Sequence, residues 1–186
     1  MKKIMFNDKY GLTQAVLEVR KTQTRRTFLK PGEENLLHGI TPEYLISVKS
    51  RYKVGETIAI AQSYKDARVH PFFLLSPLGD GVYAIDSNGW DNKMFVRADL
   101  MLHRIKITNI RVERLQDISE DDCLKEGIWR DDNVGLEGTT YWYRGLANSS
   151  FRTPQGAYAS LIDRISGKGT WASNPYVFVY DFELIN

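Results

Sequence analysis

Apolar residues recur at helical spacing in residues 12–19 and again in residues 154–165. We expect the first helix to be capped from Asn7 or Asp8. A threonine and a proline open the second stretch, which is typical of an N-cap and a first helical position, and a glycine follows it. Residues 119–127 begin with a serine and three acidic residues and end with a glycine, so they predict a short capped helix.

Alternating apolar and polar residues predict strands at residues 57–61, 103–115 and 176–184. In the second of these the alternation slips by one residue, and a β-bulge near residues 108–109 would restore the pairing. The third is apolar or aromatic at nearly every position, so both of its faces should be covered. Residues 21–27 are rich in threonine but carry no apolar side chain, which favours an extended segment with polar groups on both faces.

These helices and strands do not alternate regularly, which argues against a doubly wound parallel sheet. An α+β fold fits better: a small, mostly antiparallel, partly closed β-barrel with peripheral helices. Between the elements we expect a loop at residues 31–41, a turn at residues 52–56 and an irregular, hairpin-like excursion over residues 64–89.

The chain has 186 residues, of which 42% are hydrophobic, so a single domain over residues 1–186 with a real core is expected. Cys123 is the single cysteine, which excludes an internal disulfide and fits a reducing compartment. The three histidines are isolated, so neither a metal nor a cofactor is predicted.

No signal peptide and no apolar run of about 20 residues is visible, so we expect a cytoplasmic protein with no membrane partner. The formal net charge of +2 neither requires nor excludes a nucleic-acid partner. The oligomeric state is left open by the sequence.

Candidate chemistry is concentrated in residues 21–26, here called the polar run, which reads Lys21-Thr22-Gln23-Thr24-Arg25-Arg26. Three cations and two threonine hydroxyls could bind an anion or a nucleobase, because arginine presents planar, bidentate donors. The alternative is a solvated edge strand whose charges prevent aggregation, which is a common arrangement.

Glu126 stands at the end of a predicted helix, where the helix dipole disfavours an anion. We therefore expect a cation of the polar run as its partner. Trp171 and Asn174 could stack on a base and read its edge, but a turn packed by an aromatic side chain is the favoured interpretation. Cys123 is expected to be a buried helix residue.

Taken together, these motifs resemble the ASCH-domain family, a branch of the PUA-like β-barrels, and most closely its phage and prophage members. The resemblance rests on residues 20–26, 52–56, 105–128 and 171–178. It leaves out segments near residues 64–92 and 129–152, which would be insertions. This chain also differs by having Gln62 where the family often has glutamate, and Val19 where a small residue is common.

The resemblance implies a barrel with a polar cleft lined by the polar run and a ligand that is RNA or a modified nucleoside. The ligand-binding candidates are Thr22, Arg25, Arg26, Trp171 and Asn174. One bacterial branch of the family removes the acetyl group from acetylcytidine, and its catalytic Lys, Thr and Glu match Lys21, Thr24 and Glu126 here.

Amide hydrolysis at such a site would use Thr24 as the nucleophile and Lys21 as its base, with Glu126 as the orienting group. Burial and the neighbouring arginines would lower the pKa of Lys21, whereas pairing with Glu126 would raise it. We therefore predict that these three residues converge on one site. Three functions stay open: a binding protein for RNA or a modified nucleoside, an amidohydrolase, and a phage-derived protein-interaction module.

Overall fold

The computed structural model describes residues 1–29, 38–68, 88–132, 138–146 and 150–185. By its contacts the chain divides into two compact units. The first comprises residues 1–6, 57–106 and 184–186, and the second comprises residues 7–56 and 107–183. The prediction of a single domain with two insertions stays a prediction, and residues 69–87 of the expected excursion lie outside the described residues.

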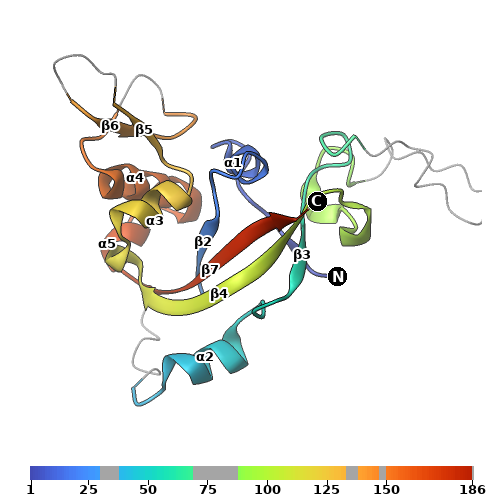
Figure 1. Cartoon of the computed structure of the whole chain (residues 1–186), viewed down its shortest axis with the longest axis horizontal. Helices are drawn as coiled ribbons and strands as arrows, with labels where there is room; N and C mark the ends of the chain where they lie inside the picture. Colours follow the sequence, from blue (N-terminus) through green and yellow to red (C-terminus); the bar gives the residue numbers. More distant parts are fainter. Residues whose placement is uncertain (30–37, 69–87, 133–137, 147–149, 186) are drawn as a thin grey trace, which may run out of the picture. The chain divides into compact units, whose positions relative to one another are not determined.

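The α+β class is confirmed (Figure 1). The strands are β1 Lys3–Ile4, β2 Gln23–Thr27, β3 Thr57–Ile60, β4 Arg104–Arg114, β5 Trp129–Asp131, β6 Thr140–Trp142 and β7 Tyr176–Ile185. The helices are α1 Leu12–Leu17, α2 Pro42–Lys49, α3 Glu120–Lys125, α4 Pro154–Ser166 and α5 Thr170–Ser173, with short 3-10 turns at η4 Lys93–Phe95, η5 Ala98–Leu100 and η6 Leu115–Asp117.

Five strands follow the order β1-β3-β4-β7-β2, and β5 and β6 form a separate two-stranded sheet. The pairs β3–β4 and β2–β7 are antiparallel, whereas β1–β3 is parallel. Among the described strands no pairing closes the five-stranded sheet into a barrel. Within the same residues no helix is long and apolar enough to cross a membrane.

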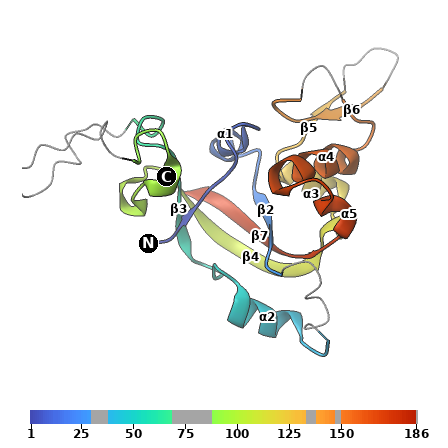
Figure 2. The same cartoon turned by 180° about the vertical axis from the view of Figure 1, so that it is seen from behind.

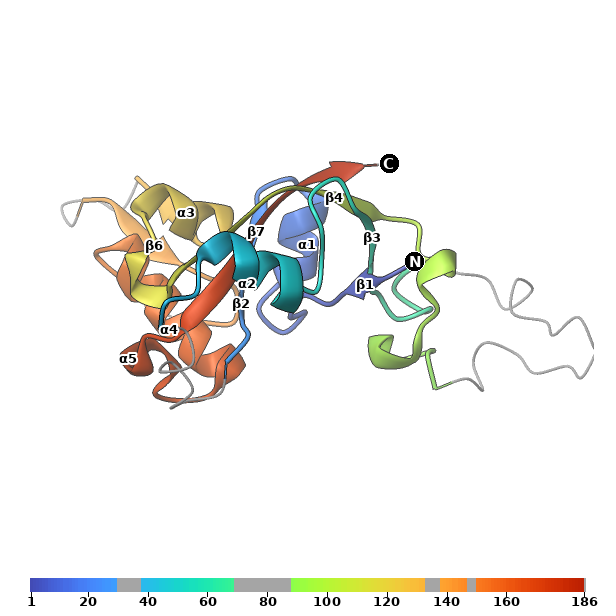
Figure 3. The same cartoon turned by 90° about the horizontal axis from the view of Figure 1, so that it is seen from below.

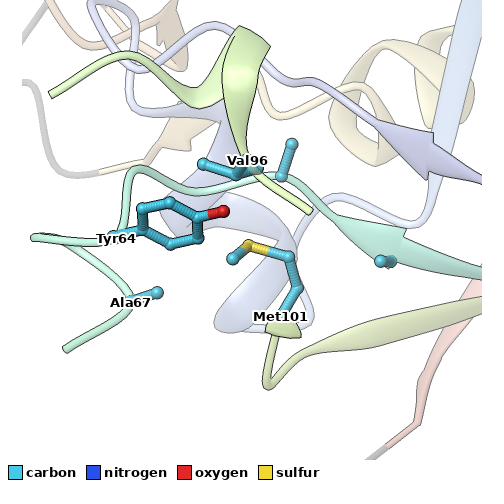
Figure 4. Close-up of a cluster of buried hydrophobic side chains, with 6 residues drawn as sticks. Tyr64, Ala67, Val96 and Met101 are labelled. Carbon is cyan, nitrogen blue, oxygen red and sulfur yellow. The ribbon is translucent and has the colours of Figure 1, made fainter. Parts of the chain in front are cut away.

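The first unit has its own small core around β3. Tyr64, Ala67, Val96 and Met101 pack together beside the buried alanines of residues 59–61 (Figure 4). The Tyr64 hydroxyl accepts a hydrogen bond from the backbone N–H of Arg97 at 3.0 Å. The phenol is therefore buried without losing its polar partner.

The second unit groups α3, α4 and α5 with the β5–β6 hairpin, as Figures 1 and 2 show from opposite sides and Figure 3 from below. Its central strand is β7, whose residues 177–180 are all buried, as expected for a strand covered on both faces. In β4 the buried positions shift phase at residues 108–109, which are both exposed. This confirms the predicted slip in alternation.

Two helix caps follow the predictions. The Ser119 side chain accepts the N–H of Asp122 at the start of α3, and Thr153 accepts the N–H of Gly156 at the start of α4. Gly127 ends α3 with a positive φ of 103°, the conformation that glycine adopts without strain.

The prediction for α1 is wrong at both of its ends. Gly11, with φ 65°, precedes the first helical residue, and no side chain caps the helix, so neither Asn7 nor Asp8 is the N-cap. The helix ends at Leu17, and Val19 adopts a φ of 59° with its side chain exposed rather than on the apolar face. Helix α2 was not expected at all, although Thr41 and Pro42 open it as an N-cap and first residue.

Candidate functional site

The polar run leads into β2, which pairs with β7 in the register Gln23↔Asp181 to Thr27↔Val177. β2 is an edge strand of the five-stranded sheet, as the alternative interpretation expected. The expected solvation is wrong for most of the polar run, because Lys21 is 2% exposed, Arg25 is 5% exposed, and Gln23 and Thr24 are also buried. Carboxylates from other elements compensate the buried cations. Thr22 is half-buried, and Arg26 and Thr27 are exposed.

Lys21 and Glu126 lie 105 residues apart in sequence and are in direct contact. The Lys21 Nζ donates to the Glu126 Oε2 at 2.5 Å, to the Glu126 backbone carbonyl at 2.9 Å and to the Gln23 carbonyl at 2.7 Å. All three ammonium donors therefore have acceptors. The predicted convergence is therefore confirmed for Lys21 and Glu126. For Thr24, the third residue of that prediction, it stays a prediction.

Helix α3 explains why this contact forms. Glu126 is its C-cap, so the Glu126 carbonyl and carboxylate both lie at the negative end of the helix. A buried ammonium satisfies both groups at once. The backbone N–H of Thr22 also donates to the carbonyl of Lys125 at 3.0 Å, which ties the beginning of the polar run to the last turn of α3.

Arg25 is held by three carboxylates and its side chain is fully buried. One Nη atom lies 3.2 Å from the Glu126 Oε1, and the other lies 2.6 Å from Glu113 and 3.0 Å from Asp122. The first Nη also donates to the side-chain carbonyl of Gln23. Burial lowers the pKa of Arg25, but Glu126 and the other carboxylates outweigh it, and the net pKa is raised.

The contacts continue through Arg111 of β4 into a network that returns to β2. Arg111 pairs with Asp122 at 2.5 Å, with Asp181 at 2.7 Å and with Glu113 at 3.3 Å. The side-chain amide of Gln23 donates to Asp181 at 2.5 Å. The ion-pair network, as we call it, consists of Lys21, Arg25, Arg111, Glu113, Asp122, Glu126 and Asp181 together with Gln23.

Lys125 adds a fourth cation, because its ammonium pairs with Asp122 at 3.2 Å, so four cations face four carboxylates and the charges balance. Sequence reasoning missed Arg111, Glu113, Asp122 and Asp181 as members. One signal was available: Arg111 and Glu113 are two residues apart on one strand, and so lie on one face. Asp181 gives a second signal, because it is an acidic residue inside a largely apolar strand.

Burial has the largest effect on the pKa of Lys21. Burial lowers this pKa, Glu126 raises it, and Arg26 and Arg25 lower it further. The net pKa of Lys21 lies below its ordinary value of 10.5. Nearby, burial raises the pKa of the Cys123 thiol to about 12 and the pKa of the Tyr158 phenol well above its usual range. The cysteine is therefore an unreactive core residue, as expected.

Thr24 lies three residues after Lys21 and is 4% exposed. It faces Tyr180 in the β2–β7 register. Among the described residues no hydrogen bond to another side chain or backbone group engages its hydroxyl. Thr22 joins the sheet through its carbonyl, which accepts the N–H of Phe182 at 2.9 Å.

Trp171 and Asn174 form the turn that precedes β7. The Trp171 ring packs edge-on against Tyr158 at 6.2 Å, and the Asn174 side-chain oxygen accepts the backbone N–H of Gln116 at 2.8 Å. Asn174 itself adopts a φ of 44°. Within the described part of the chain no hydrogen bond or ion pair links them to residues 21–26, and these contacts support the packed turn.

A planar stack adjoins the site. The Arg20 guanidinium lies 3.6 Å from the centre of the Trp129 ring, which in turn stacks on Trp142 at 5.2 Å and an interplanar angle of 5°. Arg20 directly precedes Lys21, so the stack attaches the β5–β6 hairpin to the chain beside the polar run. No pattern in the sequence indicates this contact.

Comparison of the chain with protein-family models, with curated proteins and with solved structures finds no match. No cluster of three metal-ligating side chains occurs in the described ranges either.

Proposed function

We propose that this chain is a cytoplasmic ASCH-domain protein with a PUA-like barrel, and that it binds a modified nucleoside, free or within RNA, beside Lys21, Thr24 and Glu126. The observation that carries this proposal is the buried contact of the Lys21 Nζ with the Glu126 carboxylate. Burying such a pair costs several kcal/mol of desolvation, so the pair is a poor way to stabilise the fold. Buried charged pairs of this kind are typical of functional sites.

The charge balance favours an uncharged ligand group at this site. Each carboxylate of the ion-pair network is matched by a cation once Lys125 is counted, and both Nη atoms of Arg25 already bind carboxylates. A phosphate placed there would meet no net positive charge, whereas a base offers neutral donors and acceptors to Thr24 and Glu126. In an RNA ligand the phosphates would contact exposed cations such as Arg26 instead.

Binding can be measured by calorimetry with acetylcytidine, cytidine and short RNAs that contain either base. We expect tighter binding of the modified base, and loss of binding in Lys21→Met, which keeps the length of the stem but lacks the ammonium that holds the Glu126 carboxylate. The matched control is Lys49→Met, because Lys49 is exposed in the last turn of α2. Equal affinity of wild type and Lys21→Met for every ligand would refute the proposed site.

Amide hydrolysis is the second candidate function, and the lowered pKa of Lys21 favours it. In this reaction the Thr24 Oγ attacks the acetyl carbonyl and passes its proton to neutral Lys21. Lys21 then protonates the departing exocyclic amine, which leaves an acetyl ester on Thr24. Water hydrolyses the ester, releases acetate and restores the threonine.

Release of acetate from acetylcytidine tests this second function. Thr24→Ser should retain part of the turnover because the hydroxyl remains, whereas Thr24→Ala should lose it. Thr27→Ala is the control, since Thr27 lies at the exposed end of the same strand. Binding without acetate release would leave the first proposal alone, and neither binding nor release would favour the protein-interaction module.

A further inference from the structure

We propose that Arg25 is a positioning residue, which holds one oxygen of the Glu126 carboxylate so that the other oxygen faces Lys21. This inference rests on the proposed function for its biological meaning, and it assigns Arg25 a role other than contact with the ligand. Arg25 lies four residues after Lys21, and both cations bind the same carboxylate through different oxygens.

The geometry around Glu126 supports this division of labour. Its Oε1 lies 3.2 Å from the Arg25 Nη1, and its Oε2 lies 2.5 Å from the Lys21 Nζ. A carboxylate held at one oxygen cannot rotate freely, so the position of the other oxygen relative to Lys21 is fixed. Arg25 is fixed in turn by Glu113 and Asp122, at 2.6 and 3.0 Å.

Arg25 is an unsuitable ligand-binding residue for the same reason. Its side chain has no solvent-exposed surface, and each Nη atom already has two acceptors. The Nε is buried and has no hydrogen-bond partner within the described residues. The guanidinium is thus oriented by its two Nη atoms alone, and all of its hydrogen bonds go to side chains of the protein.

The charged and titratable groups around this pair come from several elements. Lys21 is influenced by Glu126 from the end of α3 and by Arg25 and Arg26 from β2. Arg25 is influenced by Glu126, Tyr158, Glu113 and Asp122, which add α4 and β4 to the surrounding elements. Arg25 is therefore the group that couples the Lys21–Glu126 pair to the rest of the ion-pair network.

A pH titration of the lysine side chain in the intact protein tests the inference without any ligand. Lysine is labelled with ¹³C at Cε, and the Lys21 resonance is identified by its absence from the spectrum of Lys21→Met. Arg25→Lys keeps the positive charge but loses the fork, so Glu126 is no longer held at its Oε1 and its contact with the Lys21 ammonium weakens. The midpoint of the Lys21 titration should therefore move to lower pH in Arg25→Lys, because Glu126 is the group that raises the Lys21 pKa against burial.

Arg111→Lys is the matched control. It makes the same exchange of guanidinium for ammonium, but Arg111 binds Glu113, Asp122 and Asp181 and makes no hydrogen bond to Glu126. Its Lys21 midpoint should stay closer to that of the wild type. The inference is overturned by a midpoint that is unchanged or higher in Arg25→Lys, or by an equal shift in Arg111→Lys. Should Arg25→Lys fail to fold, Arg25→Met is compared with Arg111→Met, and a higher midpoint in Arg25→Met than in Arg111→Met overturns the inference, because it reports the lost charge alone.

The outcome is separable from that of the proposed function. A shifted midpoint in a protein that binds no nucleoside would retain the positioning role and retire the nucleoside site. Nucleoside binding with an unshifted midpoint would retire the positioning role only.

Discussion

Val19 adopts a left-handed backbone conformation, with φ 59°, immediately before the polar run. A β-branched side chain is strained there, and strain of this kind costs of order 1–3 kcal/mol. The turn it makes lets the N–H groups of Arg20 and Lys21 both donate to the Ala15 carbonyl, each at 2.9 Å. The strained residue therefore sets the direction in which the chain enters the site.

Val19→Gly should stabilise the protein by about 1 kcal/mol, because relief of strain exceeds the entropy that glycine adds to the unfolded chain. The midpoint of chemical denaturation measures the change. Val54→Gly is the control, since Val54 is similarly exposed, at 62% against 60%, but has no positive φ. A stability loss in Val19→Gly as large as in Val54→Gly would show that the conformation carries no strain.

Glu126 raises the pKa of Lys21 against the lowering effect of burial. If neutral Lys21 is the base of an amidohydrolase, turnover increases as pH rises through this pKa, which lies below 10.5. Glu126→Gln removes the charge that raises it, so the rising limb of the pH–rate profile should move to lower pH even if the maximum rate falls. Glu113→Gln, which alters the network without touching Lys21, should leave the limb in place. A limb that moves to higher pH in Glu126→Gln contradicts the assignment of Lys21 as the base.

At the scale of elements, the end of α3 packs closely on α1 and Lys21. A Cβ added at Gly127 would lie 3.2 Å from the Leu12 side chain and 3.7 Å from the Lys21 Cδ. The glycine is needed both for its φ of 103° and for this close approach. The position of the Glu126 carboxylate therefore depends on the residue that follows it.

Gly127→Ala should destabilise the protein by about 1–3 kcal/mol and weaken nucleoside binding. Gly167→Ala separates the cost of the positive φ from the cost of the close packing. Gly167 ends α4 with a similar φ of 108° but has no atom within 4 Å of an added Cβ. The difference in unfolding free energy between the two variants measures the packing on Leu12 and Lys21. Equal losses would mean that the backbone conformation accounts for the whole effect.

Local signals predicted the elements well where they act within one turn or one strand. The caps at Ser119 and Thr153 and the phase slip at residues 108–109 were all readable. Helix α2 was missed although its Thr41-Pro42 start repeats the Thr153-Pro154 signal, because only Leu45 in it is buried and the apolar periodicity is weak.

The site was predictable only in part. A carboxylate at a helix end indicated that Glu126 needs a cation, and Lys21 supplies it. The burial of Arg25 was not predictable, because it depends on carboxylates that β4 and α3 bring from 88 and 97 residues away. Residue types reveal that charges must be paired, but only the fold determines which of them meet.

For the whole molecule, the net charge of +2 leaves little general attraction for a polyanion. Any binding of RNA must then depend on a few exposed cations, and Arg26 is the exposed arginine of the polar run. Arg25 cannot contribute in this way, because its side chain is buried among carboxylates.

Arg26→Ala should weaken RNA binding alike for all sequences and flatten the plot of log affinity against log salt by about one unit, if Arg26 contacts one phosphate. Fluorescence anisotropy at several salt concentrations measures both quantities. Arg97→Ala, which removes an exposed arginine of the first unit, serves as the control for a change in net charge alone. An unchanged slope in Arg26→Ala would remove the polar run from contact with the RNA backbone.

The pairing of β2 with β7 has a consequence for synthesis on the ribosome. Gln23 bonds to Asp181, 158 residues later, and at about 5–20 residues per second the interval between them lasts roughly eight to thirty seconds. During that time β2 has no strand partner, and an unpaired strand invites association with other chains. Lys21 and Arg25, which the native site encloses, are still solvated then, so their charges oppose association of the nascent chain before they become part of the site.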